Sequence, residues 1–185
     1  MQGKGKIVEL AGLRGSTPAV ERHRGFLDVL HKCPDIKIVS TVDAGWFKDS
    51  AREAFDSILH CQPEIDLLFA HNDRMAAGAY EAALRQSRNQ EILFIGVDAL
   101  SGDNLGVELV ANGVLDATFI YPTGGDKVMQ VAMAILQGRP FQRENLMQSA
   151  LVNHSNARIM EMQTAHIRTS VSYTHLRAHE TKANL

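Results

Sequence analysis

The feature that most constrains this chain is a repeated alternation of short apolar strands with amphipathic helices. The strand segments are rich in β-branched or other apolar residues and cover residues 6–10, 36–40, 65–70, 92–97 and 115–120. The helical patterns between them cover residues 17–31, 51–59, 73–85 and 104–111. Strands alternating with helices in this way predict right-handed βαβ units. The predicted fold class is therefore α/β, with three layers around a doubly wound parallel sheet.

The run from Ile65 to Ala70 supports a parallel sheet in particular. It is apolar except for Asp66, which is typical of a strand covered on both faces. The helix predicted after it is rich in alanine, and such small side chains let a helix approach a sheet closely. We therefore expect the sheet to be parallel.

The pattern changes after Pro122. Gly124 and Gly125 precede a long helix predicted over 126–136, and Gly138 follows it as a C-terminal cap. One more strand is predicted at 149–152 and one more helix at 156–166. Residues 171–181 resemble one reading frame of a common sequencing adapter, so residues 171–185 are interpreted as an artefact tail and carry no functional argument.

Composition excludes several classes of protein. A chain of 185 residues with 45% hydrophobic and 22% charged residues is close to the soluble globular average, so disorder and low complexity are excluded. A formal net charge of −2 offers no basic field for a phosphate backbone, and no direct contact with nucleic acid is expected. No apolar run reaches the ~18 residues of a spanning helix, and no signal sequence opens the chain.

Signatures of enzymes are weak in this sequence. The stretch after the first strand lacks the G-x-G-x-x-G spacing, and no G-x-x-x-x-G-K-[ST] loop is present. Asp43, Asp73 and Asp98 sit on different predicted loops and offer oxygen ligands for Mg²⁺, but no lysine is clearly placed beside them for phosphoryl transfer. We therefore predict a protein that is not an enzyme, with no catalytic residues, no metal site and no cofactor.

Polar and aromatic side chains follow the predicted strands at the edge where ligands bind in open parallel sheets. They are Arg22, Asp43, Trp46, His71, Asn72, Asp73, Asp98 and Tyr121. An arginine fork, an amide and a carboxylate can pair with hydroxyl groups, while aromatic rings can cover the C–H face of a sugar. Together these types of residue indicate a neutral, polyhydroxylated ligand.

Each of these residues also has an ordinary structural role open to it. Asn72 and Asp73 can cap the helix that follows them; we favour the cap for Asp73 and ligand contact for Asn72. Arg22 can be a solvated helix residue, Trp46 a core or surface aromatic, and Asp98 a stabiliser of its loop. Their joint occurrence at corresponding strand ends is what favours a binding site.

Three stretches of the chain carry a resemblance to a known family. They are the segment from Gly12 to Phe26, with Gly15, Glu21, Arg22 and Gly25; the segment from Phe69 to Ala79, with Asn72, Asp73, Met75 and Gly78; and the segment from Ile95 to Asp98. Over about residues 3–154 the chain resembles ribose-type periplasmic sugar-binding proteins and the effector domains of LacI-type repressors. The resemblance implies that Arg22, Trp46, Asn72, Asp98 and Tyr121 line a carbohydrate cleft. Tyr121 departs from the glutamine often found at its position.

Two further stretches, 119–126 and 156–167, look like the periplasmic sensor region of carbohydrate-sensing hybrid two-component histidine kinases. This resemblance implies a sensory domain that closes on a mono- or small oligosaccharide and signals to a membrane-bound kinase. It also implies a periplasmic location and a parent protein that is anchored in the inner membrane and dimeric. The alternatives are a LacI-type effector domain, a free periplasmic sugar-binding protein of an ABC transporter and, less favoured, a small α/β enzyme.

The family fold has two lobes, and the resemblance divides the chain accordingly. Residues 1–120 would form the second lobe, 121–145 a crossover and a helix belonging to a first lobe that is missing, and 146–154 a returning strand. Residues 155–170 would lead towards the membrane. The apolar face of the crossover helix, with Val128, Val131, Ala132, Ile135 and Leu136, would then be exposed or misdocked. With half of the site absent, we expect the isolated chain to bind sugar negligibly.

Overall fold

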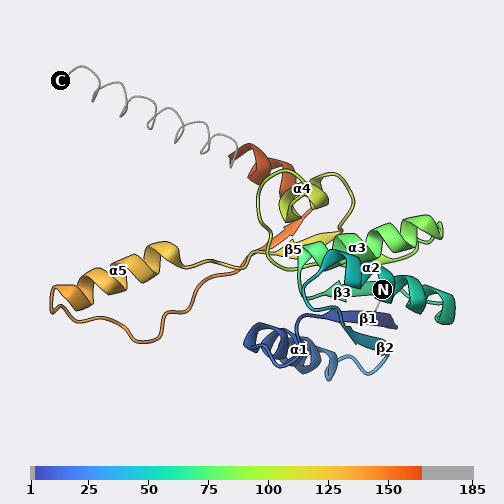
Figure 1. The fold of residues 1–185 in the computed structure, drawn as a ribbon, viewed down its shortest axis with the longest axis horizontal. Coiled ribbons are helices and arrows are strands. Elements are labelled where there is room, and N and C mark those ends of the chain that lie inside the picture. The colour runs from blue at the N-terminus through green and yellow to red at the C-terminus, as the bar shows by residue number, and fades with distance from the viewer. Residues whose placement is uncertain (1–2, 164–185) are drawn as a thin grey trace, which may run out of the picture.

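The computed structural model of the chain describes residues 3–163 (Figure 1). Its strands are β1 (Gly5–Ala11), β2 (Ile36–Asp43), β3 (Leu67–Ala70), β4 (Leu93–Ile95), β5 (Ala117–Phe119) and β6 (Leu151–Asn153). Its helices are α1 (Thr17–Leu30), α2 (Lys48–Cys61), α3 (Asp73–Arg85), α4 (Gly106–Ala111) and α5 (Gly125–Leu136). Residues 157–163 are also helical.

The strands form one sheet in the order β2-β1-β3-β4-β5-β6. The pairs among β1 to β5 are parallel, and β6 pairs antiparallel with β5. The predicted α/β class with a doubly wound parallel sheet is confirmed, as is the extra strand near residue 150. The strand order reverses at β1 and β3, which is where open sheets of this kind place a ligand.

Alternation along β1 explains why helices cover both faces of the sheet. Val8 and Leu10 are fully buried and belong to the main core, together with Phe55 of α2 and Ala79 of α3. Glu9 points to the opposite face, because successive residues of a strand alternate, and its carboxylate contacts α1. Figure 1 shows the same division, with α2 and α3 on one side of the sheet and α1 on the other.

Several predicted boundaries differ from those observed. β2 extends to Asp43 because its last residues stay paired with β1 as far as Ala11. β4 and β5 are shorter than predicted, since the ladder between them contains only the pair Ile95 and Ala117, followed by an isolated bridge. α4 begins at Gly106 rather than near residue 104, because Asn104 has a positive φ of 56° that does not fit a helix.

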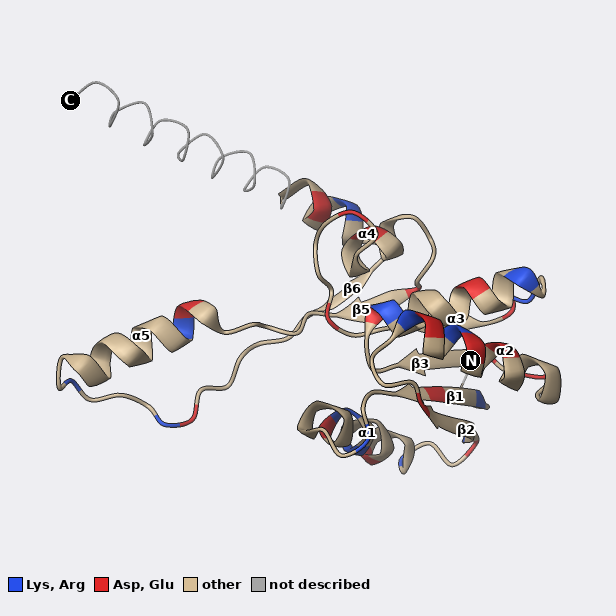
Figure 2. Ribbon diagram, viewed as in Figure 1, with Lys and Arg blue, Asp and Glu red and all other residues tan. Residues whose placement is uncertain are grey.

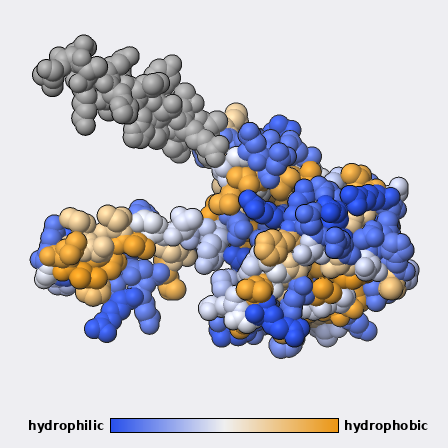
Figure 3. Space-filling model, in the orientation of Figure 1, coloured by the Kyte–Doolittle hydropathy of each residue, from blue (hydrophilic) through white to orange (hydrophobic). Residues whose placement is uncertain are grey.

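Helix α5 stands away from the sheet on two connecting segments (Figure 1). Val128 is 64% exposed, Leu136 is 81% exposed and Ile135 is 53% exposed, while Val131 and Ala132 are half-buried and line a groove with Met147. Figure 2 shows α5 without charged residues over most of its length, and Figure 3 shows apolar surface gathered on it. The apolar face expected to be uncovered is therefore largely exposed.

Two sequence predictions reach beyond the described residues. The helix predicted over 156–166 is present as far as residue 163, and its remaining part and the segment 171–185 lie outside the described range. Within residues 3–163, none of the helices has both the length and the apolar character needed to cross a bilayer.

Candidate functional site

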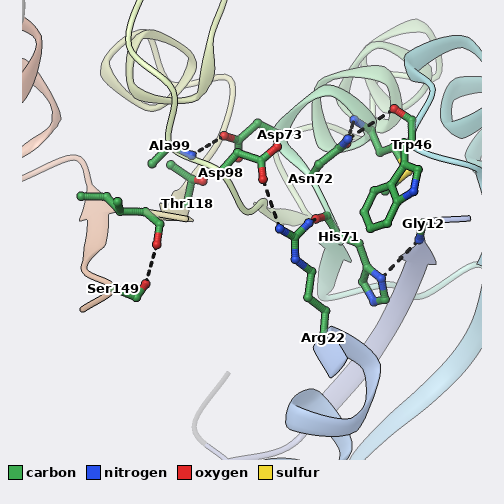
Figure 4. A network of polar contacts seen from close by, with 12 residues as sticks. Gly12, Arg22, Trp46, His71, Asn72, Asp73, Asp98, Ala99, Thr118 and Ser149 are labelled. Atoms are coloured by element: carbon green, nitrogen blue, oxygen red, sulfur yellow. Dashed lines mark hydrogen bonds and ion pairs between the residues drawn. The ribbon is translucent and has the colours of Figure 1, made fainter. Parts of the chain in front are cut away.

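The guanidinium of Arg22 is the centre of the candidate site (Figure 4). Its Nη2 lies 3.2 Å from Oδ1 of Asp98, and its Cζ lies 5.4 Å from the ring centroid of Trp46 and 5.0 Å from that of Tyr121. These distances place the cation against both aromatic rings. The structure thus brings together four of the five residues predicted for the site, which come from α1 and from the loops after β2, β4 and β5.

A second hydrogen bond fixes the direction of the Arg22 side chain. Nη1 donates to the backbone carbonyl oxygen of His71, at the end of β3, and the side chain is only 15% exposed. Arg22 therefore spans from α1 to the ends of two strands. A planar fork of donors allows one side chain to hold both partners at once.

Asn72, the fifth predicted residue, lies at the start of α3 beside this cluster. Its Oδ1 accepts a hydrogen bond of 2.8 Å from the backbone N–H of Met75, so Asn72 is the N-cap of the helix. Its Nδ2 donates to the backbone carbonyl of Trp46 at 3.3 Å. One hydrogen of the amide group makes that bond, and the second gives Nδ2 the capacity to donate to a ligand as well.

The cap predicted for Asp73 is wrong, because its carboxylate points away from the helix end. The residue is 4% exposed, and its side chain accepts hydrogen bonds from Oγ1 of Thr118 at 2.5 Å and from the backbone N–H of Ala99 at 2.8 Å. Burial raises the pKa of Asp73 to about 7, against the hydrogen bonds from Thr118 and Ala99, which lower it. Burial also raises the pKa of Asp98, while Arg22 acts in the opposite direction.

Strained backbone coincides with the site. Trp46 has a φ of 75°, Asp98 a φ of 123° and Ala99 a φ of 48°, all in a region that non-glycine residues rarely adopt. Such conformations cost roughly 1–3 kcal/mol each and cluster where a side chain has to be aimed. Gly12 has a related role, because a Cβ at this position would collide with the indole ring of Trp46.

Asp43 was predicted at the same edge but takes another partner. Its Oδ2 lies 2.6 Å from Nε of Arg14, whose side chain is 89% exposed. This ion pair links the loop after β1 to the last residue of β2. The three aspartates therefore have separate partners. Asp43 bonds to Arg14, Asp73 bonds to Thr118 and Ala99, and Asp98 bonds to Arg22.

Sequence reasoning missed a buried polar network beneath the site. Glu9 is fully buried, and its Oε1 accepts from Nε2 of His71 at 2.9 Å and from Nδ1 of His23 at 2.9 Å. The backbone N–H of Gly12 donates to Nδ1 of His71 at 3.2 Å, which leaves the ring proton on Nε2, facing Glu9. The sequence did contain a signal of this network, namely Glu9, a charged residue inside the predicted strand 6–10.

The hydrogen bonds to Glu9 decide its charge. Burial acts to raise the pKa of Glu9, but the hydrogen bonds from His71 and His23 lower it, and the net direction is downward. Glu9 is therefore ionised at neutral pH. The network fixes His71, whose carbonyl oxygen holds Arg22.

Comparisons with known proteins agree with this fold. A family model described as a periplasmic binding protein domain matches residues 1–140. The D-apiose import binding protein of Actinobacillus succinogenes is 32% identical over 162 residues, covering 85% of this chain and 51% of that protein. The ribose import binding protein of Bacillus subtilis is 31% identical over 144 residues, covering 76% of this chain and 45% of that protein.

A solved structure is more similar still. The fructose-binding periplasmic domain of a hybrid two-component system superposes with a TM-score of 0.91 at 50% identity, covering 95% of this chain and 58% of that one. The chain spans about half the length of the curated relatives it matches. Since the family model matches most of its residues, the chain belongs to the periplasmic binding protein domain family.

Proposed function

We propose that this chain supplies one lobe of a two-lobed carbohydrate-binding domain, with Arg22, Trp46, Asn72, Asp98 and Tyr121 lining the sugar cleft. The observation that carries the proposal is the placement of Arg22 against the rings of Trp46 and Tyr121, with Asp98 as its ion-pair partner. Charged hydrogen-bonding groups flanked by aromatic faces are suited to a ligand with hydroxyl groups around an apolar ring face.

The chemistry of binding follows from the state of each group. Arg22 is a permanent donor and an ionised Asp98 is an acceptor, so adjacent sugar hydroxyls can accept from one and donate to the other. Arg22 is already oriented by the carbonyl of His71, which lowers the entropy lost on binding. Trp46 and Tyr121 would cover the C–H face of the ring.

The proposed ligand class is a monosaccharide or a small oligosaccharide. Support comes from the relatives, whose names specify D-apiose, ribose and fructose. Tyr121 is the residue of the site that we expect to discriminate among these sugars, since it is 54% exposed and lines the same pocket as Arg22.

We also propose the division of the chain that the family resemblance implies. Residues 1–120 would be the lobe described here, 121–145 a crossover whose helix packs on the other lobe, 146–154 a returning strand, and 155–170 an exit towards the membrane. The support is the exposed apolar face of α5, together with the antiparallel return of β6 to β5. The covering surface for α5 would come from the first lobe, outside this chain.

In the parent protein the proposed mechanism is hinge closure. A sugar held by both lobes contacts them together only in the closed state, so binding shifts the population towards that state. The movement would pass through residues 155–170 to a dimeric histidine kinase anchored in the inner membrane. The support for a sensor is the 50% identity to the domain of a hybrid two-component system.

A second candidate is a binding protein that delivers sugar to an importer. It is favoured by the names of the curated relatives, which are import binding proteins. Sugar-dependent phosphorylation of the parent would support the sensor, whereas sugar binding without any attached kinase would support the importer component.

Calorimetric titration of the parent protein with D-fructose, D-ribose and D-apiose tests the proposal. We expect one of these sugars to bind with a Kd in the micromolar range or tighter, and the 185-residue chain alone to bind negligibly. Binding of none of the three by the parent would contradict the proposed carbohydrate class. Millimolar or tighter binding by the isolated chain would contradict the two-lobed site.

A further inference from the structure

We propose that Asp73 is a positioning residue that holds Asp98 in the orientation in which it binds a sugar hydroxyl, an inference that rests on the function proposed above. Asp73 does not touch the cleft, since it is 4% exposed, and its carboxylate bonds to Ala99 beside Asp98 (Figure 4). Its effect on a ligand would therefore pass through the backbone at Asp98 and Ala99.

The carboxylate of Asp73 joins three separate elements of the fold. From the first turn of α3, Oδ2 accepts from the backbone N–H of Ala99 at 2.8 Å, and Oδ1 accepts from Oγ1 of Thr118, on β5, at 2.5 Å. The backbone N–H of Asp73 donates to the carbonyl of Val97 at 2.9 Å. Val97 and Ala99, the two neighbours of Asp98, are thus both hydrogen-bonded to Asp73.

The surrounding glycines show that this space is shaped for the carboxylate. A Cβ at Gly96 would collide with Oδ1 of Asp73, and a Cβ at Gly106 would collide with Oδ2. Only a residue without a side chain fits at either position without displacing Asp73. The two glycines come from opposite ends of the loop that carries Asp98.

The backbone that Asp73 holds is the strained part of the loop. Asp98 and Ala99 are consecutive non-glycine residues with φ values of 123° and 48°. Such a pair persists only where surrounding bonds over-determine it. Apart from the Asp73 bond, the loop is tied to the next strand by the N–H of Asp98, which donates to Phe119 at 2.9 Å, and by its carbonyl, which accepts from Tyr121 at 3.2 Å.

Two arginines, Arg22 and Arg74, act on the two carboxylates. Asp98 and Arg22 act on Asp73 in opposite directions, and Arg74 acts on Asp98. Asparagine can reproduce the hydrogen bonds of Asp73, because its oxygen can accept from Ala99 and its amide can donate to the hydroxyl of Thr118. The positioning role therefore predicts rescue by Asp73→Asn and loss in Asp73→Ala.

Amide hydrogen exchange on the full 185-residue chain tests the positioning role directly. The reference is the N–H of His71, which donates to Leu10 at 2.9 Å at the same edge of the sheet. Relative to it, we expect Asp73→Ala to lower the protection of the Ala99 amide roughly tenfold or more and Asp73→Asn to leave it within about threefold. Thr118→Val is the matched control, since it removes the other hydrogen bond and should spare Ala99.

Equal loss in Asp73→Ala and Thr118→Val, or no loss in Asp73→Ala, would overturn the inference. Asp73→Leu replaces the alanine variant if that variant does not fold, because leucine fills similar space without an acceptor. If neither the alanine nor the leucine variant folds, the wild-type chain supplies the test. In its NMR spectrum the amide proton resonance of Ala99 should move with pH as Asp73 titrates, and in Asp73→Asn it should not. A resonance that is insensitive to pH would contradict the proposal.

Sugar affinity of the parent protein, with D-fructose as the probe, supplies the functional readout. Asp73→Ala should weaken binding roughly 5- to 100-fold, and Asp73→Asn should restore it to within about threefold of wild type. Unchanged affinity in Asp73→Ala would overturn the inference. If the wild-type parent does not bind D-fructose, the proposed function fails for this sugar, while the exchange experiment still decides whether Asp73 holds the loop.

Discussion

Arg22 and Asp98, 76 positions apart in the sequence, form an ion pair in which Nη2 lies 3.2 Å from Oδ1. The pair is partly buried, with the side chain of Arg22 15% exposed and that of Asp98 30% exposed. It joins the first helix to the loop after the fourth strand. A ligand at this edge therefore meets a donor and an acceptor that already face one another.

Replacing Arg22 should weaken sugar binding by the parent protein. Arg22→Ala removes the donors and leaves Asp98 without its partner, so we expect a loss of about 1–3 kcal/mol or more in binding free energy. Calorimetry measures it. Arg24→Ala is the matched control, because Arg24 is on the same helix and its side chain is 69% exposed. Its Nη2 lies 3.7 Å from Oε2 of Glu21, which is a long distance for an ion pair. Equal affinity for the Arg22 variant and wild type would remove Arg22 from the site.

Gly12 should be essential for the position of Trp46. In Gly12→Ala the new Cβ would collide with the indole, so the ring must move away from Arg22. Trp46 is the single tryptophan of the chain, and its fluorescence emission reports the change. Gly25→Ala, on α1, is the control, since nothing lies within 4 Å of its added Cβ. Identical emission spectra for Gly12→Ala and wild type would show that the ring does not occupy this place.

Ionisation of Asp73 should lower the stability of the chain as pH rises from about 4 to about 7, whereas Glu9, whose pKa is lowered, acts in the opposite direction below about 4.5. Folded Asp73, with a pKa raised to about 7, keeps a proton that the same residue in the unfolded chain releases near its ordinary pKa of 3.8. The folded state then binds more protons across this interval, so the free energy of unfolding decreases with pH and levels off above it. Asp98, whose pKa is also raised by burial, adds a decrease of the same sign.

Asp73→Asn should make the free energy of unfolding fall less between about pH 4 and 8. The difference from wild type should be roughly 2–4 kcal/mol at most. Urea unfolding at each pH measures it. Asp49→Asn is the control, because the side chain of Asp49 is 76% exposed and its replacement should leave the wild-type slope. An identical slope in the Asp73 variant would show that this carboxyl does not carry the pH dependence.

The exposed face of α5 should make the chain self-associate. A double variant, Val128→Lys with Ile135→Lys, places charge on this face, and we expect it to sediment as a monomer where wild type forms larger species. Gln130→Lys with Gln137→Lys adds the same charge at polar positions as a control. Monomeric wild-type chain at tens of micromolar would contradict an exposed apolar face that drives association.

Much of the fold could be predicted because its signal is local. The apolar run 65–70 and the alanine-rich helix 73–85 each have a pattern that only a buried strand or a closely packed helix explains. Strand ends were predicted less well, since the number of residues that β4 and β5 pair depends on the twist of the whole sheet. The antiparallel direction of β6 depends on the path of α5, which no local pattern encodes.

The candidate site was predictable as a set of positions but not as a set of contacts. Topology places Arg22 and Asp98 at one edge, which their positions after predicted strands already indicated. The cap at Asn72 rather than Asp73 could not be read from adjacent polar residues, because Thr118 and Ala99, which hold Asp73, are distant in sequence. Glu9 was missed because its partners, His23 and His71, come from different elements.

A crystal structure of the parent protein with D-fructose is the most direct test of the central claim. We predict electron density for the sugar between two lobes, with hydroxyls within hydrogen-bonding distance of Arg22 and Asp98 and a ring face against Trp46 or Tyr121. Sugar bound at a place that none of these side chains reaches would contradict it.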